Sequence, residues 1–229
     1  MSDLFRGPGV ALLTLFHDDG SIDTSATADL ARGLVDRGMQ AVLAAGTTGE
    51  AATLTNAERS ALIDAIRRAI PAQIPVIAGT GAPSTRQAAG LTEEAVAAAA
   101  QGRPVLAYHF PRVYPPGIPV DALAGLPVAG QKDSSGDPDR LLDELAHYPG
   151  ATYVGSAAVL ALAGPLGATG ALLALANVEP ERCAAAFAGD AAAQRELTGR
   201  HLAASRGGVP ALKRILAEDW GRPVSVRVG

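Results

Sequence analysis

Short apolar runs alternate with longer amphipathic stretches along most of this chain, and this alternation limits the folds that the chain can adopt. The first run, residues 9–16, is continuously apolar, which indicates a strand buried on both faces. The predicted strands are 9–16, 40–45, 74–78, 104–108, 128–132, 152–154 and 171–175. Because helices of suitable length separate them, the pattern predicts parallel strands joined by crossovers.

Capping patterns mark where several helices begin. Thr55 and Glu58 have the spacing of a capping box, as do Ser84 and Gln87. Asp137 precedes a proline that suits the first turn of a helix. The predicted helices are 24–37, 55–70, 84–100, 137–148 and 157–166, and the chain is predicted to be helical from residue 180, with breaks at Gly189 and at Gly207 and Gly208.

Seven strand–helix units without a Gly-x-Gly-x-x-Gly turn favour a (β/α) barrel over a dinucleotide-binding sheet. We therefore predict an α/β fold of the TIM (β/α)8 type with a short C-terminal helical extension. The barrel is expected over residues 1–178, and its last helix and the extension over 179–229. A length of 229 residues suits one domain of barrel size.

Composition excludes several classes of function. Nineteen basic and 23 acidic residues give a net charge of −4, and no basic block suggests nucleic acid as a partner. Aromatic residues make up only 4%, so the core must consist of Ala, Leu and Val. The single cysteine, Cys183, is interpreted as a buried thiol. Without a signal-peptide pattern or an uninterrupted apolar span, we expect a soluble cytoplasmic protein with no membrane partner.

Lys132 is the first candidate for chemistry, because it ends the predicted strand 128–132. Burial at a strand end disfavours the ammonium form, which lowers the pKa and makes a neutral nucleophile available. A lysine that forms a Schiff base needs this property. The alternative is a lysine that extends its amine into solvent.

Polar residues at the other strand ends complete a candidate site. Gly46-Thr47-Thr48-Gly49-Glu50 combines hydroxyl donors with glycines that let backbone N–H groups approach a carboxylate. Tyr108 ends another strand, and its phenol could relay protons. The threonines could also be ordinary turn residues, and Tyr108 could be a core aromatic. Together the residues describe an amine, an anion cradle and an acid/base group for a 2-oxo acid.

These segments resemble the dihydrodipicolinate synthase / N-acetylneuraminate lyase family of pyruvate-dependent class I aldolases. The resemblance spans nearly the whole chain in the right order. Its main motifs are 46–54 (GTTGEAATL), 76–81 (VIAGTG), Tyr108 with Pro111, 130–136 (GQKDSSG) and 176–178 (ANV).

The resemblance implies an eight-stranded barrel, usually assembled as a homotetramer, and no metal or organic cofactor. It implies that Lys132 forms the Schiff base with pyruvate and that Tyr108 shuttles protons. It further implies that Thr47 and Thr48 bind the pyruvate carboxylate and position the tyrosine, and that backbone near Leu172 lines the pocket. Glu50 is interpreted as support for its loop or a cap of the next helix. Asp133 is expected to bond backbone groups in its loop, and Lys213 is interpreted as structural.

The chain departs from the family pattern in two places. Seven strands are predicted where the family has eight, and the absent unit falls between the predicted helix 84–100 and the strand 104–108. That strand end often carries a second tyrosine in the family, and no residue here takes its place in the sequence. After Pro111, Val113 stands where dihydrodipicolinate synthases place an arginine for the second substrate, so the resemblance does not extend to that specificity.

The leading hypothesis is a Schiff-base lyase that condenses or cleaves pyruvate, or a related 2-oxo acid, with an aldehyde, as a homo-oligomer (tetramer or dimer). One alternative is a relative that binds a 2-oxo acid without turnover, because the absent unit removes part of the site. A pyridoxal phosphate enzyme is a weaker alternative, because nothing in the sequence resembles the partners that this cofactor needs.

Overall fold

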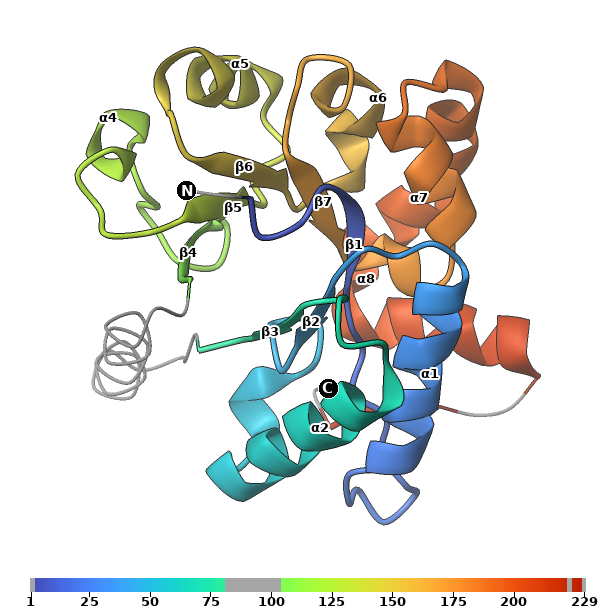
Figure 1. The fold of residues 1–229 in the computed structure, drawn as a ribbon. Helices are drawn as coiled ribbons and strands as arrows, with labels where there is room; N and C mark the ends of the chain where they lie inside the picture. The colour runs from blue at the N-terminus through green and yellow to red at the C-terminus, as the bar shows by residue number, and fades with distance from the viewer. Residues whose placement is uncertain (1–2, 81–103, 222–223, 228–229) are drawn as a thin grey trace.

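Seven parallel strands form one curled sheet with helices packed on its outer side (Figure 1). The structure is a computed structural model that describes residues 3–80, 104–221 and 224–227. The strands are Gly7–Ala11 (β1), Val42–Ala44 (β2), Val76–Ala78 (β3), Leu106–His109 (β4), Gly130–Asp133 (β5), Ala151–Val154 (β6) and Gly170–Leu173 (β7). Their order in the sheet is β3-β2-β1-β7-β6-β5-β4.

The strand order is that of a TIM-type barrel wall with one discontinuity. The first strand, β1, pairs with both β2 and the last strand, β7, as closure of a barrel requires. Within the described residues, β3 and β4 are the two ends of the sheet and are not paired with each other. The predicted fold is therefore confirmed, and the described residues form seven strands. The predicted helix 84–100 lies outside the described residues.

Six of the seven observed strands are shorter than predicted, whereas β6 is one residue longer. The difference is clearest at β1, which ends at Ala11 where the sequence predicts a strand to residue 16. The Leu12 N–H still donates to the Leu43 carbonyl of β2 at 2.9 Å, and beyond it the backbone leaves the regular ladder. The Leu13 N–H donates to the side-chain oxygen of Asn177 at 3.0 Å, and Phe16 forms an isolated antiparallel bridge with Ile22. An apolar run predicts burial, but it does not show where side chains replace strands as hydrogen-bond partners.

The helices are Thr24–Asp36 (α1), Asn56–Ala69 (α2), Val120–Leu123 (α4), Pro138–His147 (α5), Leu160–Ala163 (α6), Pro180–Phe187 (α7) and Ala191–Trp220 (α8). The capping box of Thr55 and Glu58 is formed, and Asp137 caps α5. The predicted helix 157–166 is instead a 3-10 turn over Ala157–Val159 followed by α6. The helix α4 was not predicted, because four residues are too few for a periodic pattern.

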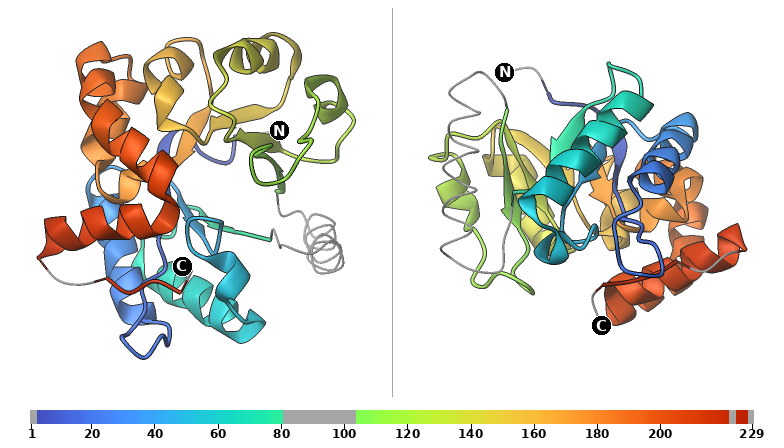
Figure 2. Two further views of the ribbon diagram at one scale, coloured as in Figure 1. Left: turned by 180° about the vertical axis from the view of Figure 1, so that it is seen from behind. Right: turned by 90° about the horizontal axis from the view of Figure 1, so that it is seen from below.

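Glycines shape the C-terminal region as the sequence predicts. Gly189 has a φ of 101° between α7 and α8, and Gly208, with a φ of 60° and a ψ of −149°, kinks α8. After α8 the chain turns back, and residues 224–227 lie close to α2 (Figure 2). In the described part of the chain, none of the helices has the length and apolar character needed to cross a membrane.

Apolar side chains pack on both faces of the sheet. Between strands and helices the buried residues include Leu34, Leu62 and Leu160. Inside the curl, Leu172 and Tyr153 belong to a second buried cluster with Phe5, whose ring stacks on Tyr153 at 4.5 Å. This inner cluster fills part of the barrel interior and leaves the strand ends to polar residues.

Candidate active site

The register between β4 and β5 places the main candidates side by side. Tyr108 pairs with Lys132, and His109 pairs with Asp133. Because side chains alternate across a strand, Tyr108 and Lys132 share one face and His109 and Asp133 share the other. Lys132 also pairs with Tyr153, whose side chain lies in the inner cluster. Lys132 and Tyr108 therefore face the inside of the curled sheet.

The amine of Lys132 is buried beside an aromatic ring. The residue is 9% exposed, and burial lowers the pKa of its amine from 10.5 to about 8. Its Nζ lies 4.8 Å from the centroid of the Tyr108 ring. Gly155, which follows β6, makes room for it, because a Cβ there would come within 3.0 Å of Lys132 Cε and would clash with Ser134. A buried lysine with a lowered pKa has the character of a nucleophilic amine.

The phenol of Tyr108 joins two loops. Burial raises its pKa, and hydrogen bonds to the side chains of Ser134 and Thr47 act in the opposite direction. Thr47 comes from the turn after β2, whereas Ser134 directly follows β5. The structure thus brings together three of the predicted residues, Lys132, Tyr108 and Thr47. Sequence reasoning gave Ser134 no role, although its place two residues after the lysine was a usable signal.

The turn that carries the threonines has an unusual backbone. Ala45 and Glu50, which bracket it, have positive φ values of 51° and 54°. The turn closes through the Ala51 N–H, which donates to the Gly46 carbonyl at 3.2 Å. Thr47 is exposed and Thr48 is half-buried, so neither residue is enclosed by the core.

The sequence analysis predicts that backbone near Leu172 lines the pocket. Leu172 is 1% exposed, and its side chain belongs to the inner cluster. Its backbone pairs with Gly9 of β1, and a Cβ on Gly9 would lie 3.1 Å from Leu172 Cδ2. The residue contributes to the apolar interior, and its proposed part in lining the pocket stays a prediction.

A second polar layer lies behind Tyr108 and Lys132, on the outer face of the same strands. His109 accepts a hydrogen bond from the Ile118 N–H through Nδ1 at 2.9 Å, and its Nε2 lies 4.0 Å from Asp133 Oδ1. Asp133 accepts the Ser135 N–H at 2.8 Å, which confirms that it bonds backbone in its own loop. Arg140 on α5 lies 3.9 Å from Asp133. This layer places charged and polar side chains of β4, β5 and α5 next to one another on the outer side of the sheet.

Glu144 is the most perturbed group of that outer layer. It is fully buried, and burial raises the pKa of its carboxyl to about 7, partly opposed by Gln131 and Arg140. Arg140 Nε lies 2.7 Å from Glu144 Oε1. These groups lie on the outer face of the sheet, away from Lys132.

An aromatic residue missed by the sequence reasoning adjoins Tyr108. Tyr114, on the loop after β4, lies edge-on to the Tyr108 ring with 6.2 Å between the centroids. It is 37% exposed, so part of this residue is accessible to solvent. The sequence offered no second tyrosine at a strand end, but the loop places one beside the first.

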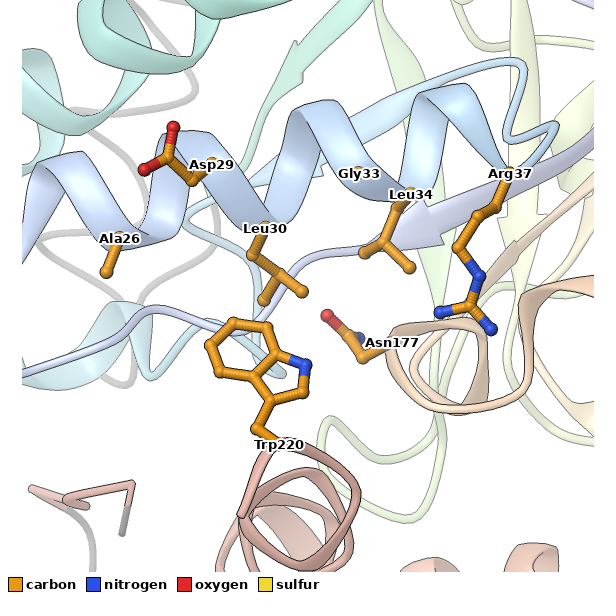
Figure 3. A pocket seen from close by; sticks show the side chains of 8 residues that line it. All are labelled: Ala26, Asp29, Leu30, Gly33, Leu34, Arg37, Asn177 and Trp220. Carbon is orange, nitrogen blue, oxygen red and sulfur yellow. The ribbon is translucent and has the colours of Figure 1, made fainter. Parts of the chain in front are cut away.

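A separate hollow of about 390 Å³ lies between α1 and the end of α8 (Figure 3). Its lining residues are Ala26, Asp29, Leu30, Gly33, Leu34, Arg37, Asn177 and Trp220. None of the predicted site residues lines it. Among the described residues, no cluster of three or more His, Cys, Asp or Glu side chains could hold a metal ion.

Comparison with known proteins identifies the family. The profile of the dihydrodipicolinate synthetase family matches residues 4–119. A 4-hydroxy-tetrahydrodipicolinate synthase of Dechloromonas aromatica is 33% identical over 241 aligned positions, which cover 89% of this chain and 82% of the relative. The chain belongs to the dihydrodipicolinate synthetase family.

Other relatives agree with this membership. An uncharacterized DapA-like lyase of Halobacterium salinarum is 34% identical over 203 positions, covering 74% of this chain and 67% of the relative. The crystal structure of the chloride-inhibited dihydrodipicolinate synthase from Acinetobacter baumannii, complexed with pyruvate, matches with a TM-score of 0.86 at 26% identity. That match covers 99% of this chain and 92% of the other.

The alignment with the Dechloromonas aromatica relative also bears on the number of strand–helix units in the barrel. Its 241 positions with the Dechloromonas family member exceed the 229 residues of this chain, so that relative carries residues without a counterpart here. This agrees with the prediction that the chain lacks one strand–helix unit of the family.

Proposed function

We propose that this family member is a class I lyase in which Lys132 forms a Schiff base with pyruvate or a related 2-oxo acid. The observation that carries the proposal is the buried amine of Lys132, with a pKa lowered to about 8, on the same strand face as the Tyr108 phenol. Family membership supports the same chemistry, since named relatives are synthases and one was crystallised with pyruvate.

In the proposed reaction, the neutral amine of Lys132 adds to the ketone carbon of the 2-oxo acid. Loss of water, with the proton moved through Tyr108, gives an iminium ion. The iminium accepts the electron pair released when a methyl proton passes through Tyr108 to water. The resulting enamine attacks the carbonyl carbon of an aldehyde, and the aldehyde oxygen takes up a proton by the same route. Water then hydrolyses the new iminium and restores the amine. Cleavage follows the same steps in reverse.

The turn after β2 is proposed to hold the substrate carboxylate. Thr47 and Thr48 provide hydroxyl donors, and Thr47 also hydrogen-bonds to Tyr108. The same residue would therefore fix the anion and orient the phenol, which places the ketone near the amine. Such prior positioning of reacting groups is a large part of catalysis by enzymes of this kind.

Borohydride trapping tests the proposal unusually cleanly, because the chain has only two lysines, Lys132 and Lys213. We expect intact mass to show one reduced pyruvate adduct, and peptide mapping to place it on Lys132. Lys132→Ala should abolish the adduct. Lys213 provides the internal control, since its Nζ is held 2.5 Å from Glu50 Oε1. An adduct on Lys213 or the N-terminal amine, or none at all, would contradict the mechanism.

A second candidate, a protein that binds a 2-oxo acid without turnover, is favoured by the unpaired ends of the described sheet at β3 and β4. Trapping alone does not distinguish it, because a binder could also form the iminium. Aldol cleavage or condensation, measured across a panel of 2-oxo acids and aldehydes, separates the two candidates. A homo-oligomer also stays part of the proposal, and light scattering of the purified protein tests it.

A further inference from the structure

The C-terminal region reaches back to the turn that carries Thr47 and Thr48. Lys213, on the last part of α8, is 1% exposed, and its Nζ donates to Glu50 Oε1 at 2.5 Å and to the Ser225 carbonyl at 2.7 Å. The Arg227 N–H donates to the other oxygen of Glu50 at 2.8 Å. Both oxygens of the Glu50 carboxylate are therefore bound by groups more than 160 residues away in sequence.

The Arg227 side chain extends this connection to neighbouring loops. Its guanidinium donates to the Gly20 carbonyl at 2.7 Å and to the Thr53 carbonyl at 3.1 Å, and it pairs with Glu58 at 2.5 Å. The Arg227 guanidinium and the Lys213 amine each lie 4.4 Å from the Phe16 ring. The loops after β1 and β2 and the start of α2 are thus joined to the C-terminal segment.

The turn that receives these contacts needs external support. Glu50 has a φ of 54° and Ala45 a φ of 51°, and such left-handed backbone is unfavourable for residues other than glycine. Strained backbone of this kind persists only where the surrounding structure fixes it, and it concentrates at functional sites. Glu50 precedes a 3-10 helix over Ala51–Thr53 and makes no side-chain hydrogen bond that caps it. Its carboxylate instead contacts Lys213 and Arg227.

The same turn ends at the candidate site, because the Thr47 side chain hydrogen-bonds to Tyr108. We propose that Lys213 is a positioning residue: with the Arg227 segment it holds Glu50, and through Glu50 it fixes the threonines that bind the substrate carboxylate. The inference rests on the proposed function, since it assigns Lys213 to the same site without contact with substrate. Loss of the contact between Lys213 and Glu50 lets the turn relax, which weakens the binding of the substrate carboxylate by Thr47 and Thr48.

The test compares Lys213→Met with Arg214→Met, because Arg214 is the next residue, is exposed and bonds only within its own helix at 3.4 Å. The readout is the pyruvate concentration that gives half-maximal borohydride trapping on Lys132. We expect it to rise about tenfold or more in Lys213→Met, the effect of about one lost charge-assisted hydrogen bond. Arg214→Met should match the wild type.

A double variant separates positioning from stability. Lys213→Met leaves the Glu50 charge buried, whereas Lys213→Met with Glu50→Gln removes both charges and should recover much of the lost stability. If Lys213 positions the turn, half-saturation stays raised in the double variant even though thermal unfolding recovers. If half-saturation returns to the wild-type value with stability, Lys213 has only a structural role and the inference is wrong.

Two further outcomes of these experiments also decide whether Lys213 positions the turn. If Lys213→Met does not fold, Arg227→Ala decides the question, because Arg227 is partly exposed and its loss should still raise half-saturation severalfold; an unchanged value overturns the inference. If the wild-type protein itself is not trapped by borohydride, the proposed function fails. If it is trapped and Lys213→Met binds pyruvate equally well, the positioning role fails while the proposed function stands.

Discussion

Replacing Lys132 by methionine should stabilise the folded protein while it abolishes iminium formation. The pKa of the buried amine falls from 10.5 to about 8 because of burial. A difference of this size corresponds to about 3 kcal/mol of free energy that the folded state loses at neutral pH by burying the charged form. Methionine has a similar length and no charge, so it avoids most of this loss with little change in packing.

The pH dependence makes this prediction specific. Between about pH 8 and 10.5 the unfolded lysine carries a proton that the folded lysine has lost, so the wild-type protein gains stability as pH rises through this window. Methionine does not titrate, so Lys132→Met lacks this contribution to the pH dependence of stability. The advantage of Lys132→Met should therefore be greatest below pH 8 and shrink as the pH approaches 10.5. Urea unfolding followed by circular dichroism at pH 7, 8.5 and 10 measures it, provided the m-values agree.

The other lysine provides a control with the opposite sign. Lys213→Met removes one partner of a buried pair and leaves Glu50 without it, so this variant should be less stable than the wild type. If Lys132→Met were also less stable, or if its advantage did not change between pH 8 and 10.5, the amine would not be desolvated as the structure indicates. The reasoning for a reactive lysine would then be wrong.

Four further predictions address the site. The rate of iminium formation should rise about tenfold per pH unit below the Lys132 pKa of about 8 and level off above it. It is measured by incubation at each pH and quenching into borohydride at one fixed pH, and a rate that still rises at pH 10 contradicts the prediction. Tyr108→Phe should lower turnover by about 10²-fold or more, with trapping retained at long times. Gly155→Ala should reduce trapping, because the added Cβ displaces Lys132 or Ser134; wild-type amplitude contradicts it. Wild-type stability should fall as pH rises from about 4.5 to about 7, because the unfolded Glu144 carboxyl ionises first, and unfolding titrations of Glu144→Gln should lack this slope.

Much of the fold follows from local patterns in the sequence. The capping signals at Thr55 and Asp137 and the glycine breaks at Gly189 and Gly208 depend on neighbouring residues only, and the structure confirms each of them. Convergence of Lys132 with Tyr108 also follows from sequence, because parallel strands place their carboxyl ends at one edge. Their direct pairing in register, however, required the structure.

The contacts that sequence reasoning did not specify join segments that are distant in the chain. Glu50 was expected to support its loop or cap a helix, and its carboxylate does the former through Lys213, 163 residues later. Tyr114 lies on an irregular loop, where no periodic pattern shows which way a side chain points. Such contacts follow from the packed fold, so a single sequence carries no local signal for them.

The two lysines show why burial alone does not make an amine reactive. Burial lowers the pKa of Lys213 as well, but the hydrogen bond and the charge of Glu50 act in the opposite direction and favour the ammonium form. For Lys132, burial is the cause of the shift, and the nearby groups on its strand face are the neutral rings of Tyr108 and Tyr153. A carboxylate placed beside Lys132 would raise its pKa and hold the amine as a donor, as Glu50 does for Lys213. The chain therefore holds one lysine as a charged anchor, and it leaves the other desolvated, as the proposed attack on a ketone requires.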